Sequence, residues 1–419
     1  MRLKYNMLYL AVFLLLGINN GVYGDITQSY HSCGILVTES DCLLFHSENQ
    51  DQLILELANT ASYQAGDQVC VSGLLELGFY ENCQSADGYL HNNTIYMSFV
   101  DDQIIIETVD DVNIELIIDN YQGEVIDSID FLSTYLTQFP GSLPIEIIIE
   151  ALNINPNVKF AHANYIMGFP ETFQISQQFP DENQPPLLEG ESPPIYYEDG
   201  GCYSIGNDSA NIIAVGTDIV IAVIDNGIDL AHPLFENDLI LPGYDFVDDD
   251  YYPDEVPGNA YGHGTFVSGI IRRIAPGAKL LPFRVFDEDG YAGSFDVAQA
   301  IYTALIDSSN VKIINMSFGT YHTIDIIEHA INSAIDSGII IVSSPGNDNT
   351  STPTYPSSYD DVISVSAIDS LDLKADFSNY GNYIDVCAPG VKIYSSLAGE
   401  YQWGYWSGTS FSAPMAAGI

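Results

Sequence analysis

The second half of the chain alternates short apolar runs with segments of helical periodicity. The apolar runs are DIVIAVID, AKLLPFRVF, KIINMSF, GIIIVSSPG and DVISVSAI. Runs that are apolar on both faces are typical of buried strands in a parallel sheet. Between them, apolar residues at helical spacing predict helices over 266–274, 295–308 and 324–337. Residues 202–419 are therefore predicted to form an α/β fold with a doubly wound parallel sheet.

Polar residues follow several of these runs, at the sheet edge where α/β folds bind their ligands. Asp225 ends the first run, and Asn347 follows the fourth. His263 lies between two glycines at a predicted helix start, and Ser410 lies at the start of a helix of small residues. A serine hydroxyl becomes a nucleophile when an imidazole takes its proton, a carboxylate orients the imidazole and donors stabilise the oxyanion. These four residues therefore predict acyl transfer to a serine.

Three sequence blocks around these residues resemble the signature blocks of the subtilisin-like serine proteases. They are VIDNGID around Asp225, GHGTFVSG around His263 and SGTSFSAPMAAG around Ser410. Their order along the chain, Asp, His, Ser, is the subtilisin order. The block GND around Asn347 resembles the family's oxyanion-hole block, and the resemblance extends from about residue 218 to residue 419. It implies a serine endopeptidase that cleaves internal peptide bonds through an acyl-enzyme.

The resemblance also implies a role for each residue. Ser410 would attack the peptide carbonyl, His263 would act as base and then as acid, and Asp225 would orient His263. Asn347 and the Ser410 backbone N–H would stabilise the oxyanion, where the loss of one donor typically costs about 3–4 kcal/mol. The segments that would pair with the substrate backbone are Ser317, Phe318 and Gly319 on one side and Tyr291, Ala292 and Gly293 on the other.

Three positions depart from the family pattern. Asn226 stands where the family usually has Thr or Ser, and we expect it to change the support of Asp225. Phe266 replaces a second histidine that takes no part in the chemistry, so we expect little effect. Pro345, in SSPG, replaces part of a run of small residues, and we expect it to reshape the specificity pocket.

Two other residues of suitable type are predicted to be structural. His232 follows Asp229 closely, but it lies in DLAHPLF, after the first strand. Ser412 lies two residues beyond Ser410 and should point away from the sheet edge, into the helix.

Residues 1–24, MRLKYNMLYLAVFLLLGINNGVYG, have the pattern of a secretory signal peptide. A short basic start precedes an apolar run that is shorter than the ~20 residues that span a bilayer. A retained anchor is the alternative. We expect a secreted protein, extracellular, at the cell surface or in the periplasm, with no membrane insertion after the signal is cleaved.

Export permits disulfides, and this chain has six cysteines. Four of them lie in residues 25–98, where short apolar runs broken by Gly and Asn predict a small β domain. This segment is similar to the OB-like modules that precede proteases in some exported bacterial chains. We expect these four cysteines to pair with one another, in an order that the sequence leaves open, whereas the last two could pair or stay free. The cysteines are Cys33, Cys42, Cys70, Cys83, Cys202 and Cys387.

Residues 99–168 have the predicted order strand, helix, strand, strand, helix, strand, which is typical of a ferredoxin-like α+β domain. Residues 169–201 are rich in proline and acidic residues, which predicts an exposed linker. A ferredoxin-like domain in front of a subtilisin-like domain resembles the family's inhibitory propeptide. The resemblance implies a segment that inhibits the enzyme until it is cut, and a permanent structural domain is the alternative.

The composition is strongly acidic, with 57 acidic and 10 basic residues and a formal net charge of −47. Such a surface repels nucleic acid and anionic membranes, so we exclude both as partners. A solvated acidic surface is expected, with capture of a basic partner as the alternative. The acidic run 245–257 could hold a structural calcium ion, although it lacks calcium-loop spacing. The expected partners are protein or peptide substrates and the chain's own propeptide, and the chemistry should need no cofactor.

Two hypotheses about function follow. The first is a secreted endopeptidase made as a proenzyme. The second is an inert surface-binding protein in which residues 25–98 carry the function. The presence of Asp225, His263, Asn347 and Ser410 favours the enzyme. The helix that begins near Thr409 is short at residue 419, whereas the family continues through further helices, so we expect a fragment that could itself be inactive.

Overall fold

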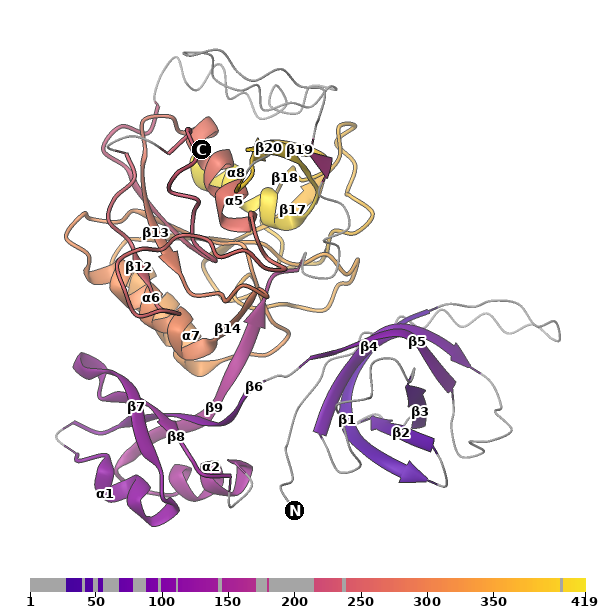
Figure 1. Ribbon diagram of the computed structural model, residues 1–419, viewed down its shortest axis with the longest axis vertical. Helices are drawn as coiled ribbons and strands as arrows, with labels where there is room; N and C mark the ends of the chain where they lie inside the picture. Colours follow the sequence, from indigo (N-terminus) through magenta and orange to yellow (C-terminus); the bar gives the residue numbers. More distant parts are fainter. Residues whose placement is uncertain are drawn as a thin grey trace. The chain divides into compact units, whose positions relative to one another are not determined.

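The computed structural model describes residues 99–170 except 111 and 142–144, residues 179–180, and residues 215–419 except 236–238 and 400–401. Of residues 28–96 it describes the backbone of five strands. The chain divides into two compact units, Met1–Ile166 and Met167–Ile419, each of which is visible in Figure 1. The predicted signal peptide, Cys83, Cys202 and most of the predicted linker lie outside the described residues.

The first strands of the chain form a closed barrel in the order β1-β2-β3-β5-β4 (Figure 1). Neighbouring strands are antiparallel except for β3 and β5, which are parallel. On β1 and β4, Cys33 and Cys70 are direct partners in the register. The strands are β1 (Gln28–Glu39), β2 (Cys42–Ser47), β3 (Gln52–Leu55), β4 (Gln68–Leu77) and β5 (Gly88–Tyr96).

The rest of the first unit has the order strand, helix, strand, strand, helix, strand that the sequence predicts. Its four strands lie in the order β9-β6-β8-β7, and every neighbouring pair is antiparallel. Ile104 and Ile106 on β6 pack with Ile118 and Ile148 of the helices in one buried core. The elements are β6 (Phe99–Thr108), α1 (Glu115–Ile118), β7 (Glu124–Ile129), β8 (Thr134–Gln138), α2 (Ile145–Asn153) and β9 (Val158–Gly168).

The second unit is built on a seven-stranded parallel sheet in the order β12-β13-β11-β15-β16-β17-β18. The five predicted apolar runs form five of these strands, so the predicted parallel sheet is confirmed. The two edge strands are short and were not predicted. The strands are β11 (Val220–Asp225), β12 (Tyr244–Asp245), β13 (Lys279–Arg284), β15 (Ile313–Met316), β16 (Ile340–Ser343), β17 (Val362–Ile368) and β18 (Val386–Pro389).

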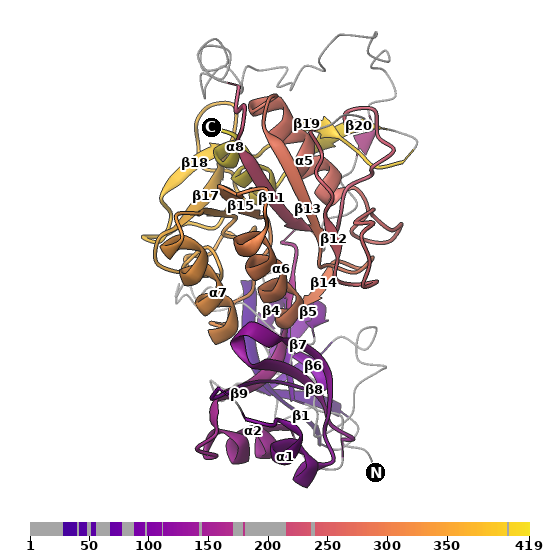
Figure 2. The same cartoon turned by 90° about the vertical axis from the view of Figure 1, so that its left-hand side faces the viewer.

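Helices cover both faces of this sheet, with α5 beside α8 on one face and α6 beside α7 on the other (Figure 2). Ile221 and Val223 on β11 pack with Phe266 and Ile270 of α5 and with Met415 of α8. The first helix begins three residues earlier than predicted. The helices are α5 (His263–Ile274), α6 (Ser294–Ile306), α7 (Asp325–Asp336) and α8 (Ala413–Gly418).

Several smaller elements lie outside the seven-stranded sheet. A hairpin of β19 (Ile393–Ser396) and β20 (Trp403–Trp406) leads into the 3-10 turn Thr409–Phe411. Strand β10 (Phe179–Pro180) pairs antiparallel with β20, and β14 (Tyr291–Gly293) precedes α6. Among the described residues, we find no helix with the length and apolar character needed to span a membrane.

Candidate active site

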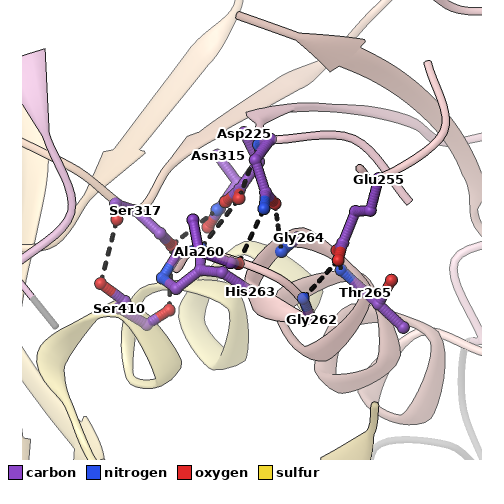
Figure 3. Close-up of polar contacts among 11 residues, drawn as sticks. Asp225, Glu255, Ala260, Gly262, His263, Gly264, Thr265, Asn315, Ser317 and Ser410 are labelled. Atoms are coloured by element: carbon purple, nitrogen blue, oxygen red, sulfur yellow. Dashed lines mark hydrogen bonds and ion pairs between the residues drawn. The ribbon is translucent and has the colours of Figure 1, made fainter. Parts of the chain in front are cut away.

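The carboxyl end of strand β11 brings Asp225 and His263 together (Figure 3). Asp225 is the last residue of β11 and His263 is the first residue of α5. His263 Nδ1 lies 2.8 Å from Asp225 Oδ1, and both side chains are 1% exposed. Because a carboxylate at this distance accepts the Nδ1 proton, it selects the tautomer in which Nε2 can take a proton.

The glycines on either side of His263 are required by the backbone. Gly262 has a φ of 97°, in the left-handed region that side chains other than that of glycine rarely adopt. A Cβ atom on Gly264 would lie 2.1 Å from the carbonyl oxygen of Gly227. The block GHG therefore allows α5 to begin against the loop that follows Asp225.

Glu255 is buried beside the first turn of α5 and holds it. Its Oε2 accepts a hydrogen bond from Gly262 N, and its Oε1 accepts one from Thr265 N at 2.5 Å. Burial raises the pKa of Glu255 to about 8, against the opposing effect of the hydrogen bonds from Thr265 and Gly262, and the charge of Asp225 raises the pKa further. This carboxyl group thus fixes the N–H groups that flank His263 on both sides.

Asn226 joins the end of β11 to the same helix start. Its Nδ2 donates to Ala260 O at 2.8 Å, and its Oδ1 accepts from Gly264 N at 2.9 Å. Its main-chain N–H donates to Asp225 Oδ1 at 2.9 Å. The side chain that departs from the family pattern therefore supports the helix of His263, while the support of Asp225 comes from the main chain of the same residue.

Ser410 is fully buried in the 3-10 turn Thr409–Phe411. The sequence predicts a helix start near Thr409, where the 3-10 turn begins, and the α-helix α8 begins at Ala413. Proline is tolerated in the first turn of a helix, and Pro414 occupies that position here. Ser410 Oγ donates to Ser317 O at 2.9 Å, and Ser317 Oγ donates to Ser410 O at 2.9 Å. Figure 3 shows these two serines on one side of His263 and Glu255 on the other.

Asn347 lies beside the turn that carries Ser410. Its Oδ1 accepts hydrogen bonds from Thr409 N and Thr409 Oγ1, both at 2.9 Å. These bonds fix the orientation of the amide, whose Nδ2 is then the end that could donate to an oxyanion. The side chain is 9% exposed, so it lies at the boundary between the core and the site.

Aromatic rings surround the imidazole of His263. The ring of Phe169 stacks on it with centroids 3.9 Å apart, and those of Phe411 and Trp406 lie 5.7 and 5.8 Å away. Phe266, in place of the family's second histidine, packs on Phe411 at 4.6 Å. The rings of Phe169, Phe411 and Trp406 therefore cover the imidazole with apolar surface.

A segment of the chain itself runs along the predicted substrate-binding residues. Gly168 N donates to Gly319 O at 3.3 Å, and Gly319 N donates to Gly168 O at 3.0 Å. On its other side, a Cβ atom built on Gly168 would lie 3.8 Å from the ring of Tyr291. Phe169, the next residue, is 2% exposed. Gly319 and Tyr291 thus both lie beside one extended segment, and the ring of Phe169 in this segment stacks on His263.

The side chains of His232 and Ser412 make hydrogen bonds to main-chain groups outside the candidate site. His232 Nε2 contacts Gln402 O at 2.7 Å, its Nδ1 accepts from Leu234 N at 3.1 Å, and burial lowers its pKa. Ser412 Oγ donates to the carbonyls of Ala388 and Pro389, both at 3.1 Å, away from the turn of Ser410.

The acidic run 245–257 contributes mainly to internal hydrogen bonds. Asp245 and Asp248 each accept from Arg284 Nη1 at 2.6 Å, and Glu255 accepts from α5. Within the parts of the chain that are described, no group of three or more candidate metal ligands is found. The roles of Glu255 and Phe169 were not predicted, since an acidic residue in an acidic run and the first residue of a predicted exposed linker carry no local sign of burial in a site. At Phe169, which is 2% exposed, the prediction of an exposed linker is wrong.

A parallel α/β sheet with a buried aspartate–histidine pair and a serine at its carboxyl edge defines a serine hydrolase of the subtilisin type. Residues 216–419 match the subtilase family (peptidase S8), and residues 93–164 match the fervidolysin N-terminal prodomain. The chain belongs to the subtilase family of serine proteases, and it carries a prodomain of the fervidolysin type.

Named relatives agree with this assignment. The thermophilic serine proteinase of Bacillus sp. strain AK1 is 34% identical over 289 residues, which cover 66% of this chain and 65% of that protein. Thermitase of Thermoactinomyces vulgaris is 34% identical over 217 residues, 49% of this chain and 75% of that protein. The crystal structure of fervidolysin from Fervidobacterium pennivorans shares the fold, with a TM-score of 0.64, 23% identity, and coverage of 77% of this chain and 54% of that one. The chain thus spans less than two thirds of the first of these proteins and about half of the fervidolysin chain.

Proposed function

We propose that this protein is a secreted serine endopeptidase, made as a proenzyme, with Asp225, His263 and Ser410 as its catalytic residues. The observation that carries the proposal is the buried contact of 2.8 Å between His263 Nδ1 and Asp225 Oδ1, at the sheet edge that also carries Ser410. Homology to subtilase serine endopeptidases supports the reaction class.

The proposed reaction uses only side chains and main-chain groups of the chain. His263 Nε2 takes the proton of Ser410 Oγ as this oxygen attacks the peptide carbonyl, and Asp225 stabilises the imidazolium that forms. Asn347 Nδ2 and the Ser410 N–H donate to the oxyanion. His263 then gives its proton to the leaving amine, and water hydrolyses the resulting ester by the same steps in reverse roles.

The proenzyme part of the proposal rests on the segment that leaves β9. Gly168 pairs with Gly319, one of the residues expected to bind the substrate backbone, and Phe169 covers the ring of His263. A substrate peptide would need the same hydrogen bonds and the same surface. We therefore assign the ferredoxin-like residues 99–168 as an inhibitory propeptide, which the match to a fervidolysin-type prodomain supports.

Other features of the chain bear on export, on the barrel and on a structural calcium ion. The pattern of residues 1–24 and the cysteines of the barrel support export, and the strand order of the barrel supports an OB-like module. A structural calcium ion would have to use oxygens of the acidic run other than those of Asp245 and Asp248 that bind Arg284.

An internally quenched peptide with blocked ends tests the proposed activity. We expect the protein, after its propeptide is removed, to cleave this peptide at an internal bond. Ser410→Ala should abolish the cleavage. Ser412→Ala, which removes a hydroxyl two residues away that faces Ala388 and Pro389, should retain it. Absence of cleavage by the unsubstituted protein would favour the inert binding protein instead.

A further inference from the structure

The segment Gly168–Pro170 lies in a defined register against the strand-like segment Ser317–Gly319. Gly168 and Gly319 exchange both of their main-chain hydrogen bonds in an antiparallel bridge. In an antiparallel ladder, such doubly bonded pairs recur at every second residue. The segments are antiparallel, so the register is followed forward from Gly168 and backward from Gly319. One step places Phe169 opposite Phe318, and two steps place Pro170 opposite Ser317. Pro170 therefore occupies the position of the next doubly bonded pair.

Ser317 marks the position of the nucleophile along this register. Ser410 Oγ lies 2.9 Å from Ser317 O, and Ser317 Oγ lies 2.9 Å from Ser410 O. The residue opposite Ser317 is consequently the one whose carbonyl group comes to Ser410. The register thus assigns the bond that follows Pro170 as the peptide bond presented for attack.

Proline at this position cannot complete the ladder. A residue opposite Ser317 would donate its N–H to Ser317 O, but proline has no N–H. Ser317 O instead accepts the hydrogen bond from Ser410 Oγ. Pro170 itself is half-buried. The chain therefore presents a segment that fits the cleft as far as Phe169 and lacks a hydrogen bond at the residue to be cut.

From this geometry we propose that Pro170 protects the bond after it from Ser410, so that Gly168–Pro170 acts as an uncut plug. The proposal rests on the proposed function. Cleavage here would join Ser410 Oγ to the carbonyl carbon of residue 170, release the amine of residue 171 with a proton from His263, and end with hydrolysis of the ester by water. Without the N–H of residue 170, the residue to be cut lacks its hydrogen bond to Ser317 O and is held less firmly during the attack. Activation of the enzyme then requires a cut at another bond.

Substitutions that restore the N–H test this role. Pro170→Ala and Pro170→Leu both supply the missing donor and differ in side chain, so agreement between them isolates the N–H. Pro140→Ala is the matched control, because Pro140 is an exposed proline in the first unit. Each variant is made in the full chain, and Ser410→Ala is added to each to show that a cut is made by the enzyme itself.

The readout is the time course of fragments that end at residue 170, followed by intact-mass and terminal-peptide mass spectrometry. We expect both Pro170 variants to form this fragment about tenfold faster than the unsubstituted chain, the usual effect of one added hydrogen bond. Pro140→Ala should match the unsubstituted chain, and Ser410→Ala should abolish the cut in every variant.

Two results of this time course would overturn the proposal. One is a rapid cut after Pro170 in the unsubstituted chain, and another is equal rates in the Pro170 variants and the Pro140 control. Hydrolysis of an added quenched peptide, measured on each variant after its propeptide has been removed, separates the two levels of inference. If the added peptide is cleaved while the Pro170 variants show no gain, the protective role alone is wrong. If no variant cleaves the added peptide, the proposed function is wrong and the protective role with it.

Discussion

Ser317 and Ser410 exchange hydrogen bonds, because each hydroxyl group donates to the main-chain carbonyl of the other at 2.9 Å. Asn315 Nδ2 donates to the same Ser317 Oγ at 3.0 Å. All three side chains are buried. The segment Ser317–Gly319, which pairs with Gly168, is thus hydrogen-bonded directly to the turn that carries the predicted nucleophile. A substitution in this segment should therefore alter the turn.

Ser317→Ala should lower both stability and turnover. The substitution removes the buried hydrogen bond from Ser317 Oγ to Ser410 O, and the loss of such a bond typically costs about 1–3 kcal/mol of unfolding free energy. It also loosens the turn of Ser410, so we expect kcat to fall. Ser412→Ala is the matched control, since its hydroxyl also serves buried carbonyls but away from the site. Urea unfolding and peptide hydrolysis should show a stability loss in both variants and a kcat loss in Ser317→Ala only. Equal kcat values in the two variants would contradict the coupling.

Asn347 should contribute to the rate through its amide hydrogens. Asn347→Ala and Asn347→Asp both remove the Nδ2 donor, and each should lower kcat by about 10²–10³ with little change in KM. Asn347→Asp keeps an oxygen that can accept from Thr409, so its stability should remain closer to that of the unsubstituted protein. Steady-state kinetics and thermal unfolding test both points, and full activity in Asn347→Asp would exclude the oxyanion role.

Glu255 should make stability depend on pH. Burial raises its pKa to about 8, so between the unfolded value near 4.5 and pH 8 the folded protein holds a proton that the unfolded chain releases. The free energy of unfolding should therefore fall by at most about 5 kcal/mol as pH rises through this range. Above pH 8 it should level off.

Glu255→Gln tests this dependence. It should be less stable at low pH, because its amide cannot accept at both Gly262 N and Thr265 N, but its stability should change little between pH 5 and 8. Glu288→Gln, at an exposed position, is the control. Urea unfolding is best measured with Ser410→Ala in both proteins to prevent self-digestion. A slope in Glu255→Gln equal to that of the control would show that Glu255 does not titrate in this range.

The barrel register predicts a disulfide between Cys33 and Cys70. They are direct partners on antiparallel strands, where Cα atoms lie about 4.5–5.5 Å apart, within the range that disulfides span. The sequence left this pairing open. Mass spectrometry of unreduced peptides from the exported protein should recover Cys33 linked to Cys70. Recovery of either cysteine linked to Cys42 or Cys83 would contradict it.

The parallel sheet could be predicted from sequence because its central strands are apolar on both faces. The edge strands could not, since Val386 and Cys387 at the start of β18 are exposed and β12 has two residues. The positions of Asp225 and His263 also follow from the pattern, because strand ends and glycines mark them. In the structure, His263 Nδ1 lies 2.8 Å from Asp225 Oδ1.

The supporting residues of the site could not be predicted, because their burial depends on the tertiary fold. Glu255 lies in an acidic run whose composition indicates a solvated loop, yet it accepts two N–H groups of α5. The side chain of Asn226 was expected to change the support of Asp225, but its side-chain amide bonds to Ala260 O and Gly264 N. The place of Phe169 on His263 depends on a pairing between segments about 150 residues apart, between Gly168 and Gly319.

Fluorophosphonate labelling followed by peptide mapping tests the central claim most directly. A fluorophosphonate reacts with a serine hydroxyl that a neighbouring base activates. We predict that, once the propeptide is removed, the label is found on Ser410, and that Ser410→Ala or His263→Ala abolishes labelling while Ser412→Ala does not. Labelling that survives Ser410→Ala would contradict the assignment of the nucleophile.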